Sequence, residues 1–270
     1  MDKENLSPER HQYLKKIRRT DKLVVLSQIG ILVVLLAAWE ITGRLGLIDS
    51  FILSQPSRII DTFLNMSQNG LHIHIGITIY ETIVGFVLGV ITGTLLAILL
   101  WWSKFISRVF EPYLVVLNSL PKIALGPVII IIAGAGTRAI IFMALAISLI
   151  VTVLEMLNGF QRTDSELIKM AEAFGANKKQ IFIKIVFPSN ISTLFSSLKI
   201  NIGLSLVGVI AGEFLVSKAG LGYLIVYGGQ VFKLDLVMAS VIILAVVAAL
   251  MYEGVVFLQK IVAKRFGSHY

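Results

Sequence analysis

The chain has 270 residues, of which 56% are hydrophobic, and its formal net charge is +8. The apolar residues come in blocks of about 20, the length at which a helix crosses the roughly 30 Å hydrocarbon core of a bilayer. This pattern predicts an all-α polytopic membrane protein, because a membrane β-barrel would show alternating segments of about 10 residues. The absence of cysteine excludes disulfides, thiolate metal sites and cysteine nucleophiles.

The first 22 residues are polar and basic, and an apolar run follows them. A secretory signal peptide also begins with a basic region. The apolar run, however, ends in Trp39 and Glu40 without a convincing small-residue cleavage site. We therefore interpret residues 23–42 as a retained first transmembrane span that enters from a cytoplasmic tail, residues 1–22. A cleaved signal peptide is the alternative.

Residues 43–73 connect the first span to the second. Residues 54–58 read Ser-Gln-Pro-Ser-Arg, a turn-like sequence in which Ser57 can cap a following helix. Apolar residues then recur at helical spacing: Ile59, Ile60, Phe63 and Leu64. The pattern favours an amphipathic helix on the outer membrane surface. A packed connecting helix fits the same pattern.

The second predicted span, residues 77–102, carries a glycine at every fourth position: Gly85, Gly89 and Gly93. This spacing lays a smooth strip along one helix face and allows the backbone of a neighbouring helix to approach closely. The strip is a packing signal and is not specific to any function. Trp101 and Trp102 stand where an interfacial aromatic belt belongs, and a short basic turn with Lys104 and Arg108 is expected after them.

The third predicted span, residues 113–134, contains polar and helix-breaking residues inside an apolar block: Asn118, Pro121, Lys122, Gly126 and Pro127. Each proline removes a backbone donor and disfavours straight helix before it. Irregular backbone at membrane depth is tolerated where it faces protein or a water-filled cavity, and an intramembrane lysine needs a partner or water. The segment is therefore either a helix that lines a transport path or a kinked helix near the surface with Lys122 snorkelling outward.

Three more spans are predicted at residues 139–157, 196–216 and 236–259. Between the first two of these lies a charged, helix-prone segment, residues 160–190. Residues 165–174 favour a helix, Gly175 interrupts it, and Asn177 can cap a second helix that runs to Ile185. Pro188 is expected to end the insert.

The distribution of lysine and arginine predicts the orientation. Six spans with the N-terminal tail inside place most of the basic residues in the cytoplasm, in the tail, after residue 102, in residues 160–190 and at the C-terminus. Both termini, including the tail of residues 266–270, are then cytoplasmic. This asymmetry explains the +8 charge without a nucleic-acid partner.

Motifs for chemistry are scarce. The chain has no Gly-x-x-x-x-Gly-Lys-Ser/Thr loop to hold ATP phosphates and no His-Glu-x-x-His zinc motif, and His72 and His74 are poorly spaced for one metal. We find no catalytic or metal-binding residues. Glu81 and Glu213 are the carboxylates best placed to face an internal cavity. A proton-coupled secondary transporter, a membrane-embedded enzyme and a non-transporting scaffold remain alternatives to a transporter driven by a partner.

Residues 160–190 resemble the cytoplasmic motif of membrane permease subunits of binding-protein-dependent ATP-driven importers. That motif is Glu-Ala-Ala, three residues, glycine, nine residues, then Ile-x-Leu-Pro. Here Gly175 is followed by nine residues and then by Ile185-Val186-Phe187-Pro188, and Ala171 matches the start. Lys169 and Met170 depart from it.

The rest of the chain, residues 23–265, resembles the nitrate, sulfonate and taurine type permeases. The resemblance is carried by residues 54–58, 82–89, 120–127, 134–136, 211–213 and 220–223. It implies the transmembrane-domain fold of type I ABC importers, about six transmembrane helices and a place in the bacterial cytoplasmic membrane. Expected partners are a second copy of the chain, two copies of a cytoplasmic ATPase and an extracytoplasmic solute-binding protein.

The resemblance and the residues together give the expected sites. ATP and Mg²⁺ would sit on the ATPase, and this chain would bind no cofactor. The solute would be small, and anionic or like a vitamin precursor. Residues expected to couple to the ATPase are Ala171, Glu172, Ala173, Gly175, Ala176, Lys178, Lys179, Ile185 and Pro188. Residues expected along the translocation path are Asn118, Pro121, Lys122, Glu81 and Glu213.

Overall fold

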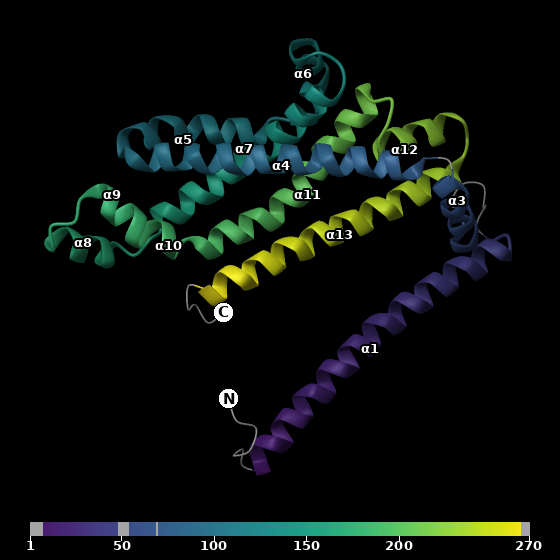
Figure 1. Ribbon diagram of the computed structural model, residues 1–270, viewed down its shortest axis with the longest axis horizontal. Coiled ribbons are helices and arrows are strands. Elements are labelled where there is room, and N and C mark those ends of the chain that lie inside the picture. The colour runs from purple at the N-terminus through teal and green to yellow at the C-terminus, as the bar shows by residue number, and fades with distance from the viewer. Residues whose placement is uncertain (1–7, 48–53, 69, 266–270) are drawn as a thin grey trace.

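The computed structural model describes residues 8–47, 54–68 and 70–265, and within these ranges every regular element is a helix (Figure 1). The predicted tail of residues 266–270 and the first seven residues of the predicted N-terminal tail lie outside these ranges. The helices are α1 (Pro8–Arg44), α3 (Pro56–Gln68), α4 (Leu71–Trp102), α5 (Lys104–Ser119), the 3-10 helix η1 (Lys122–Leu125), α6 (Gly126–Ala133), α7 (Thr137–Gln161), α8 (Ser165–Ala173), α9 (Lys178–Ile181), the π-helix η2 (Phe182–Val186), α10 (Phe187–Ser189), α11 (Ile191–Val216), α12 (Leu221–Gln230) and α13 (Leu234–Arg265).

Small residues hold the centre of the molecule together, where α7 packs between α4 and α11. A methyl group added to Gly85 of α4 would stand 2.6 Å from the side chain of Ala144 on α7, and one added to Gly208 of α11 would stand 2.6 Å from the Ala144 backbone. Gly93 meets Thr152 in the same way. The predicted close approach along the glycine strip is thus present, and the neighbour of α4 is α7.

The contacts along this strip fix the direction of the helices. Gly85 lies opposite Ala144 and Gly93 opposite Thr152, so α4 and α7 run parallel. The segment between two parallel spans has to cross back, and here it consists of α5, η1 and α6. The helices of this segment bend by 84° at residues 120–121, whereas five other helices among the described residues are each long and apolar enough to span a bilayer. If this bent pair is one span, the described residues cross the bilayer six times.

The structure differs from the sequence-based boundaries in four places. The helix at the second span starts at Leu71 instead of residue 77, and the basic residues after Trp102 form the first turns of α5 instead of a turn. The third span is broken at Pro121, because α5 ends at Ser119 and a 3-10 turn follows. Residues 8–22, expected in a separate tail, continue the helix of the first span.

The bundle has two distinct ends (Figure 1). Helices α8, α9 and α10 lie at one end, next to the C-terminal end of α4 and α7, and we call this the α8–α10 end. Helices α3 and α12 lie at the other end, which we call the α12 end. There α3 packs on α13, and it leaves Ile60 and Phe63 exposed while Ile59 is buried. Of the two interpretations that the sequence allowed for this segment, the packing of α3 on α13 agrees with the packed connecting helix.

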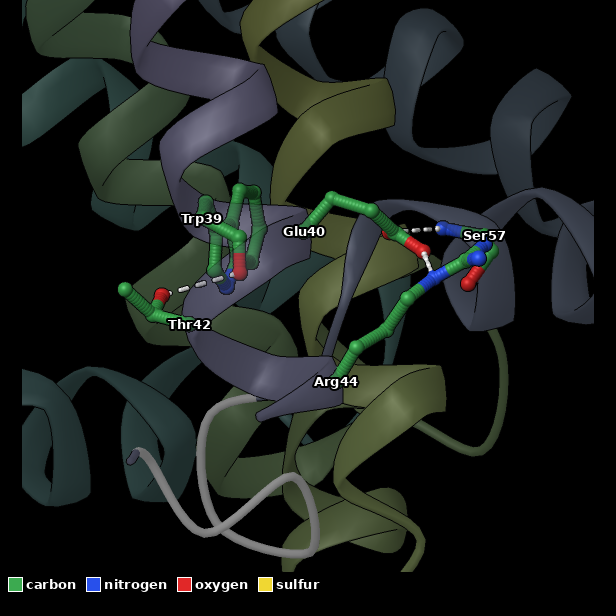
Figure 2. Close-up of polar contacts among 5 residues, drawn as sticks. All are labelled: Trp39, Glu40, Thr42, Arg44 and Ser57. Atoms are coloured by element: carbon green, nitrogen blue, oxygen red, sulfur yellow. Dashed lines mark hydrogen bonds and ion pairs between the residues drawn. The ribbon is translucent and has the colours of Figure 1, made fainter. Parts of the chain in front are cut away.

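Helix α1 stands apart from the bundle along most of its length (Figure 1). It is attached near its C-terminal end, where Glu40 accepts hydrogen bonds from the Ser57 backbone N–H (3.1 Å) and from Arg44 Nε (2.6 Å; Figure 2). Because Ser57 lies in the first turn of α3, the carboxylate also faces the positive end of that helix dipole. Gly43 packs against Gln55 beside this contact.

Candidate coupling segment and buried polar residues

Residues 160–190, the coupling segment, begin with a short helix that is capped at both ends. The Asp164 side chain accepts a hydrogen bond from Glu166 N (2.8 Å) and starts α8. At the other end Gly175 adopts a left-handed backbone (φ 81°), and the N–H groups of Gly175 and Ala176 return to the carbonyls of Glu172 and Ala171. This is a Schellman motif, in which glycine avoids the strain that a side chain would cause. The predicted interruption at Gly175 is present.

The second half of the coupling segment begins with a capping box. Asn177 Oδ1 accepts from Gln180 N (2.9 Å), and Gln180 Oε1 accepts from Asn177 N (2.8 Å). The helix is regular in α9 and then widens into the π-helix η2. Pro188 lies in the first turn of α10, where its missing N–H is harmless. It therefore begins a further turn, although the sequence suggested that it ends the insert.

Aromatic side chains join the coupling segment to the transmembrane helices. The Phe182 ring lies 5.0 Å from the ring centroid of Trp101 on α4 and 5.4 Å from that of Phe160 on α7. Lys178 Nζ donates to the Trp102 carbonyl oxygen (2.5 Å) and lies 5.6 Å from the Trp101 ring centroid. Lys178 thus makes contacts within this chain although it is exposed, and Lys179 is exposed as well.

Another part of the coupling segment's surface is open. A shallow groove of about 270 Å³ runs along it, lined by Ala171, Phe174, Gly175, Ala176, Gln180, Ile181, Lys184 and Ile185. Of the other predicted coupling residues, Glu172 and Ala173 are exposed and Pro188 is half-buried. Sequence reasoning missed Phe174, which is 85% exposed and projects at the turn. The sequence feature that could have identified it is a large apolar residue directly before the helix-ending glycine.

A second, polar cavity of about 570 Å³ lies beside the coupling segment, between the end of α7 and the start of α11. Arg162, Asp164 and Glu155 contribute charged groups, and hydroxyl and amide side chains make up most of the rest. Asn190, in its wall, donates to Thr163 Oγ1 and to the Val186 carbonyl oxygen (2.9 Å each). Sequence reasoning did not identify this cavity, because its lining residues come from four helices and the turns between them.

The predicted path residues fall into two groups that the structure keeps apart. Asn118, Pro121 and Lys122 lie at the break between α5 and η1, where Lys122 Nζ donates to the Asn118 carbonyl oxygen (2.9 Å). The ammonium group thus satisfies the carbonyl that the break leaves without a helical donor. Lys122 forms no ion pair within the described part of the chain.

Glu81 and Glu213 form the second group. Both are 1% exposed, and they lie beside each other within the packing of α4, α11 and α12. Glu213 Oε1 accepts from Thr78 Oγ1 (2.6 Å) and Oε2 accepts from Gly222 N (2.5 Å), so its carboxylate faces the N-terminus of α12. Gly220 and Gly222 leave room for it, since an added methyl group at either position would collide with Glu213.

His72 and His74 play different parts. His72 is exposed, whereas His74 Nδ1 accepts a hydrogen bond from Gly220 N (3.0 Å) and the imidazole stacks on Tyr223 (6.1 Å between centroids). His74 therefore helps to hold the loop before α12. Among the residues that the structure describes, no group of three or more His, Asp or Glu side chains is arranged to hold a metal ion.

Comparison with known proteins identifies the family and the fold to which this architecture corresponds. Residues 85–268 match the family described as binding-protein-dependent transport system inner membrane component. The fold is similar to a chain of the MetNI methionine ABC transporter in an inward-facing conformation, with a TM-score of 0.64, 19% identity, and coverage of 71% of this chain and 95% of that chain. The all-α, type I importer fold predicted from the sequence is confirmed.

Curated relatives agree with the family match. The taurine transport system permease protein of Escherichia coli is 24% identical over 86% of both chains. The nitrate import permease protein of Synechocystis is 26% identical over 73% of this chain and 71% of its own. The formylaminopyrimidine transport permease protein of Halalkalibacterium halodurans is 25% identical over 70% of this chain and 75% of its own.

The fold and these relatives define the class as a multi-pass permease of the cytoplasmic membrane. The chain belongs to the family of binding-protein-dependent transport inner membrane components, and within it to the nitrate, sulfonate and taurine type ABC importer permeases.

Proposed function

We propose that two copies of this chain form the translocation path of an ABC importer and that residues 160–190 dock on a separate cytoplasmic ATPase, which binds ATP and Mg²⁺. An extracytoplasmic binding protein delivers the solute. Membership in the permease family supports the transport role and implies both kinds of partner. The chain itself acts as a transport subunit and leaves hydrolysis to the ATPase.

The observation that carries the docking proposal is the two-faced coupling segment. One face is fixed to α4 and α7 through Phe182 and Lys178. The other presents Phe174 and the adjoining groove. The groove has both polar and apolar lining, and aromatic residues are enriched at the centres of protein interfaces. Movement of the ATPase would then rock the attached spans and change access to the path.

Cross-linking tests the docking directly, because the chain has no cysteine of its own. A Phe174→Cys variant, reconstituted with its ATPase carrying a single cysteine in the facing groove, is expected to form a disulfide-linked heterodimer. Lys260→Cys, which is exposed on α13, is the matched control. Pull-down of the ATPase by wild type and by a Gly175→Trp variant adds an independent readout. Unchanged ATPase binding after deletion of residues 165–185 would falsify the docking proposal.

For the solute, the relatives suggest a chemical class. Their names refer to taurine, nitrate and a formylaminopyrimidine, and we propose that this chain carries a similarly small solute that is anionic or like a vitamin precursor. Uptake of these compounds into proteoliposomes, in the presence of the ATPase and the binding protein, tests the proposal. The solute that competes most strongly identifies the substrate.

A proton-coupled secondary transporter is the alternative that one observation favours, namely the buried pair Glu81 and Glu213. That alternative requires uptake by the chain alone under an inward proton gradient. We expect no such uptake without ATP and the ATPase. Uptake driven by the gradient alone would replace the ATP-driven mechanism.

A further inference from the structure

The two buried carboxyl groups, Glu81 and Glu213, present an electrostatic problem. They lie side by side at 1% exposure, and neither has an ion-pair partner within the described ranges. The cations nearest in sequence, Arg138 and Lys218, are exposed. Two neighbouring negative charges removed from water in this way are strongly unfavourable unless a cation or a proton neutralises one of them.

The hydrogen bonds show that the two groups are not equivalent. Thr78 Oγ1 accepts from Leu221 N (2.8 Å), so its own proton is free to point at Glu213 Oε1 (2.6 Å). Gly222 N donates to the other oxygen (2.5 Å). Glu213 thus receives a donor on each oxygen, at the positive end of α12, and both features stabilise the ionised form.

Glu81 has the opposite environment. Neither of its carboxyl oxygens receives a hydrogen bond of normal geometry, although the side chains of Glu213 and Thr137 adjoin it. An ionised carboxylate accepts hydrogen bonds and donates none, whereas a protonated one donates an O–H. A carboxyl group that receives no hydrogen bond of normal geometry, beside a carboxylate, favours the protonated form.

We propose that the Glu81–Glu213 pair is a proton-binding site, in which Glu81 carries the proton and donates it in a hydrogen bond to the Glu213 carboxylate. The pair then keeps one negative charge, which the N–H groups at the start of α12 offset. The bound proton joins α4 to α11 and, through Gly222, to α12. This assignment is independent of the solute and of the ATPase.

Other titratable groups around the pair are accounted for. On α4, Tyr80 is exposed and His74 is bonded to Gly220. On α12, the Tyr223 ring stacks on His74, and only its backbone N–H is directed at Glu213. Arg138 at the start of α7 and Lys218 after α11 face outward. The side chains that meet the two carboxyls are therefore Thr78 and Thr137, which are neutral.

Two isosteric variants, for which different effects on stability are expected, test the assignment. In Glu81→Gln the amide N–H replaces the proposed O–H, so we expect the thermal unfolding temperature in detergent to stay within error of wild type. In Glu213→Gln the amide places a donor against the N–H groups of α12, and the temperature should fall by several degrees. Glu253→Gln, at an exposed position on α13, is the control. Equal loss in both variants, or a larger loss in Glu81→Gln, overturns the assignment.

Infrared spectroscopy provides a readout that does not depend on stability. At neutral pH the wild type and Glu253→Gln should show the carbonyl stretching band of a protonated carboxyl group, and Glu81→Gln should lack it. Persistence of the band in Glu81→Gln, or its absence from the wild type, contradicts the proposal. An unfolding temperature that rises when sodium or potassium replaces a bulky organic cation at constant ionic strength would assign the site to a metal cation and also overturn it.

Discussion

Ala144 is the residue at which three membrane helices meet. It is fully buried on α7, with Gly85 of α4 against its side chain and Gly208 of α11 against its backbone. Contacts of this kind rely on dispersion between closely fitted backbones, because lipid tails remove most of the hydrophobic drive for helices to associate. The fit at these positions therefore decides the stability of the bundle.

Two glycines of α11 provide a matched test of this fit. A methyl group at Gly208 would stand 2.6 Å from Ala144 Cα and 2.9 Å from Ala144 N, while Gly203, on the same helix, has open space. Overpacking against backbone costs about 1–3 kcal/mol. We expect Gly208→Ala to lower the free energy of unfolding in mixed micelles by that amount and Gly203→Ala to be close to neutral. Equal effects at the two positions would argue against the packing.

Within the proposed path, we propose that Lys122 contributes to solute selectivity. If its ammonium meets an anionic solute, Lys122→Ala should reduce ATP-driven uptake at least tenfold, and Lys122→Arg should retain most of it because the charge is kept. Both variants should form the complex in normal amounts. Equal uptake by the two variants would instead show that the role of Lys122 is limited to its hydrogen bond with Asn118.

At the scale of elements, the coupling segment depends on a few local bonds. Its helices are short, so they gain little from propensity and need their caps. Asn177 and Gln180 satisfy each other's backbone N–H groups at the start of α9. The capping box is therefore a sensitive point at which the segment can be loosened without touching the groove residue Phe174.

Asn177→Ala is expected to destabilise α9 by about 1 kcal/mol, the typical value of an N-cap. Hydrogen exchange measured by mass spectrometry should show faster exchange in residues 178–182 and unchanged exchange in α7. Lys179→Ala removes an exposed side chain from the same helix and serves as control. If exchange in α9 stays at the wild-type rate, the capping box does not stabilise this helix.

Much of this element-level structure can be predicted from sequence, and some cannot. Apolar blocks, Gly175 and Asn177 act through local physics, so they indicate the spans and the helix-break-helix. The pairing of Glu81 with Glu213 depends on which helices pack together, and residues 132 positions apart give no local signal. The break after Ser119 was visible in Pro121, but its 84° bend depends on packing against α7 and α11.

At the scale of the whole molecule, α1 is the least integrated helix. Its membrane window has no buried residue, so its apolar side chains are free to face lipid or another chain. Its hydrogen-bonded attachment to the bundle is through Glu40, which joins it to the first turn of α3 beside the packing of Gly43 on Gln55 (Figure 2). Arg44 binds the same carboxylate but comes from α1 itself, so it adds nothing to the connection between helices.

Loss of Glu40 should therefore widen the range of orientations of α1. Spin labels attached to cysteines introduced at Val24 and Lys260, both exposed, report the distance between α1 and α13. We expect Glu40→Ala to broaden the distance distribution measured by double electron–electron resonance. Arg44→Ala, which leaves the bond to Ser57 N intact, should broaden it much less. Equal broadening in the two variants would show that the bond between Glu40 and Ser57 N does not hold the orientation of α1.

The glycine-lined contact between α4 and α7 also has a mechanical consequence. Backbones that touch leave no flexible side chains to absorb sliding, so the two helices have to turn together. The coupling segment is fixed at Trp101 and Phe160, near one end of this pair. The 25 residues of α7 make a lever arm of roughly 37 Å at about 1.5 Å per residue. A small tilt imposed at Phe174, as the proposed docking requires, would therefore be amplified into a larger displacement at the opposite end.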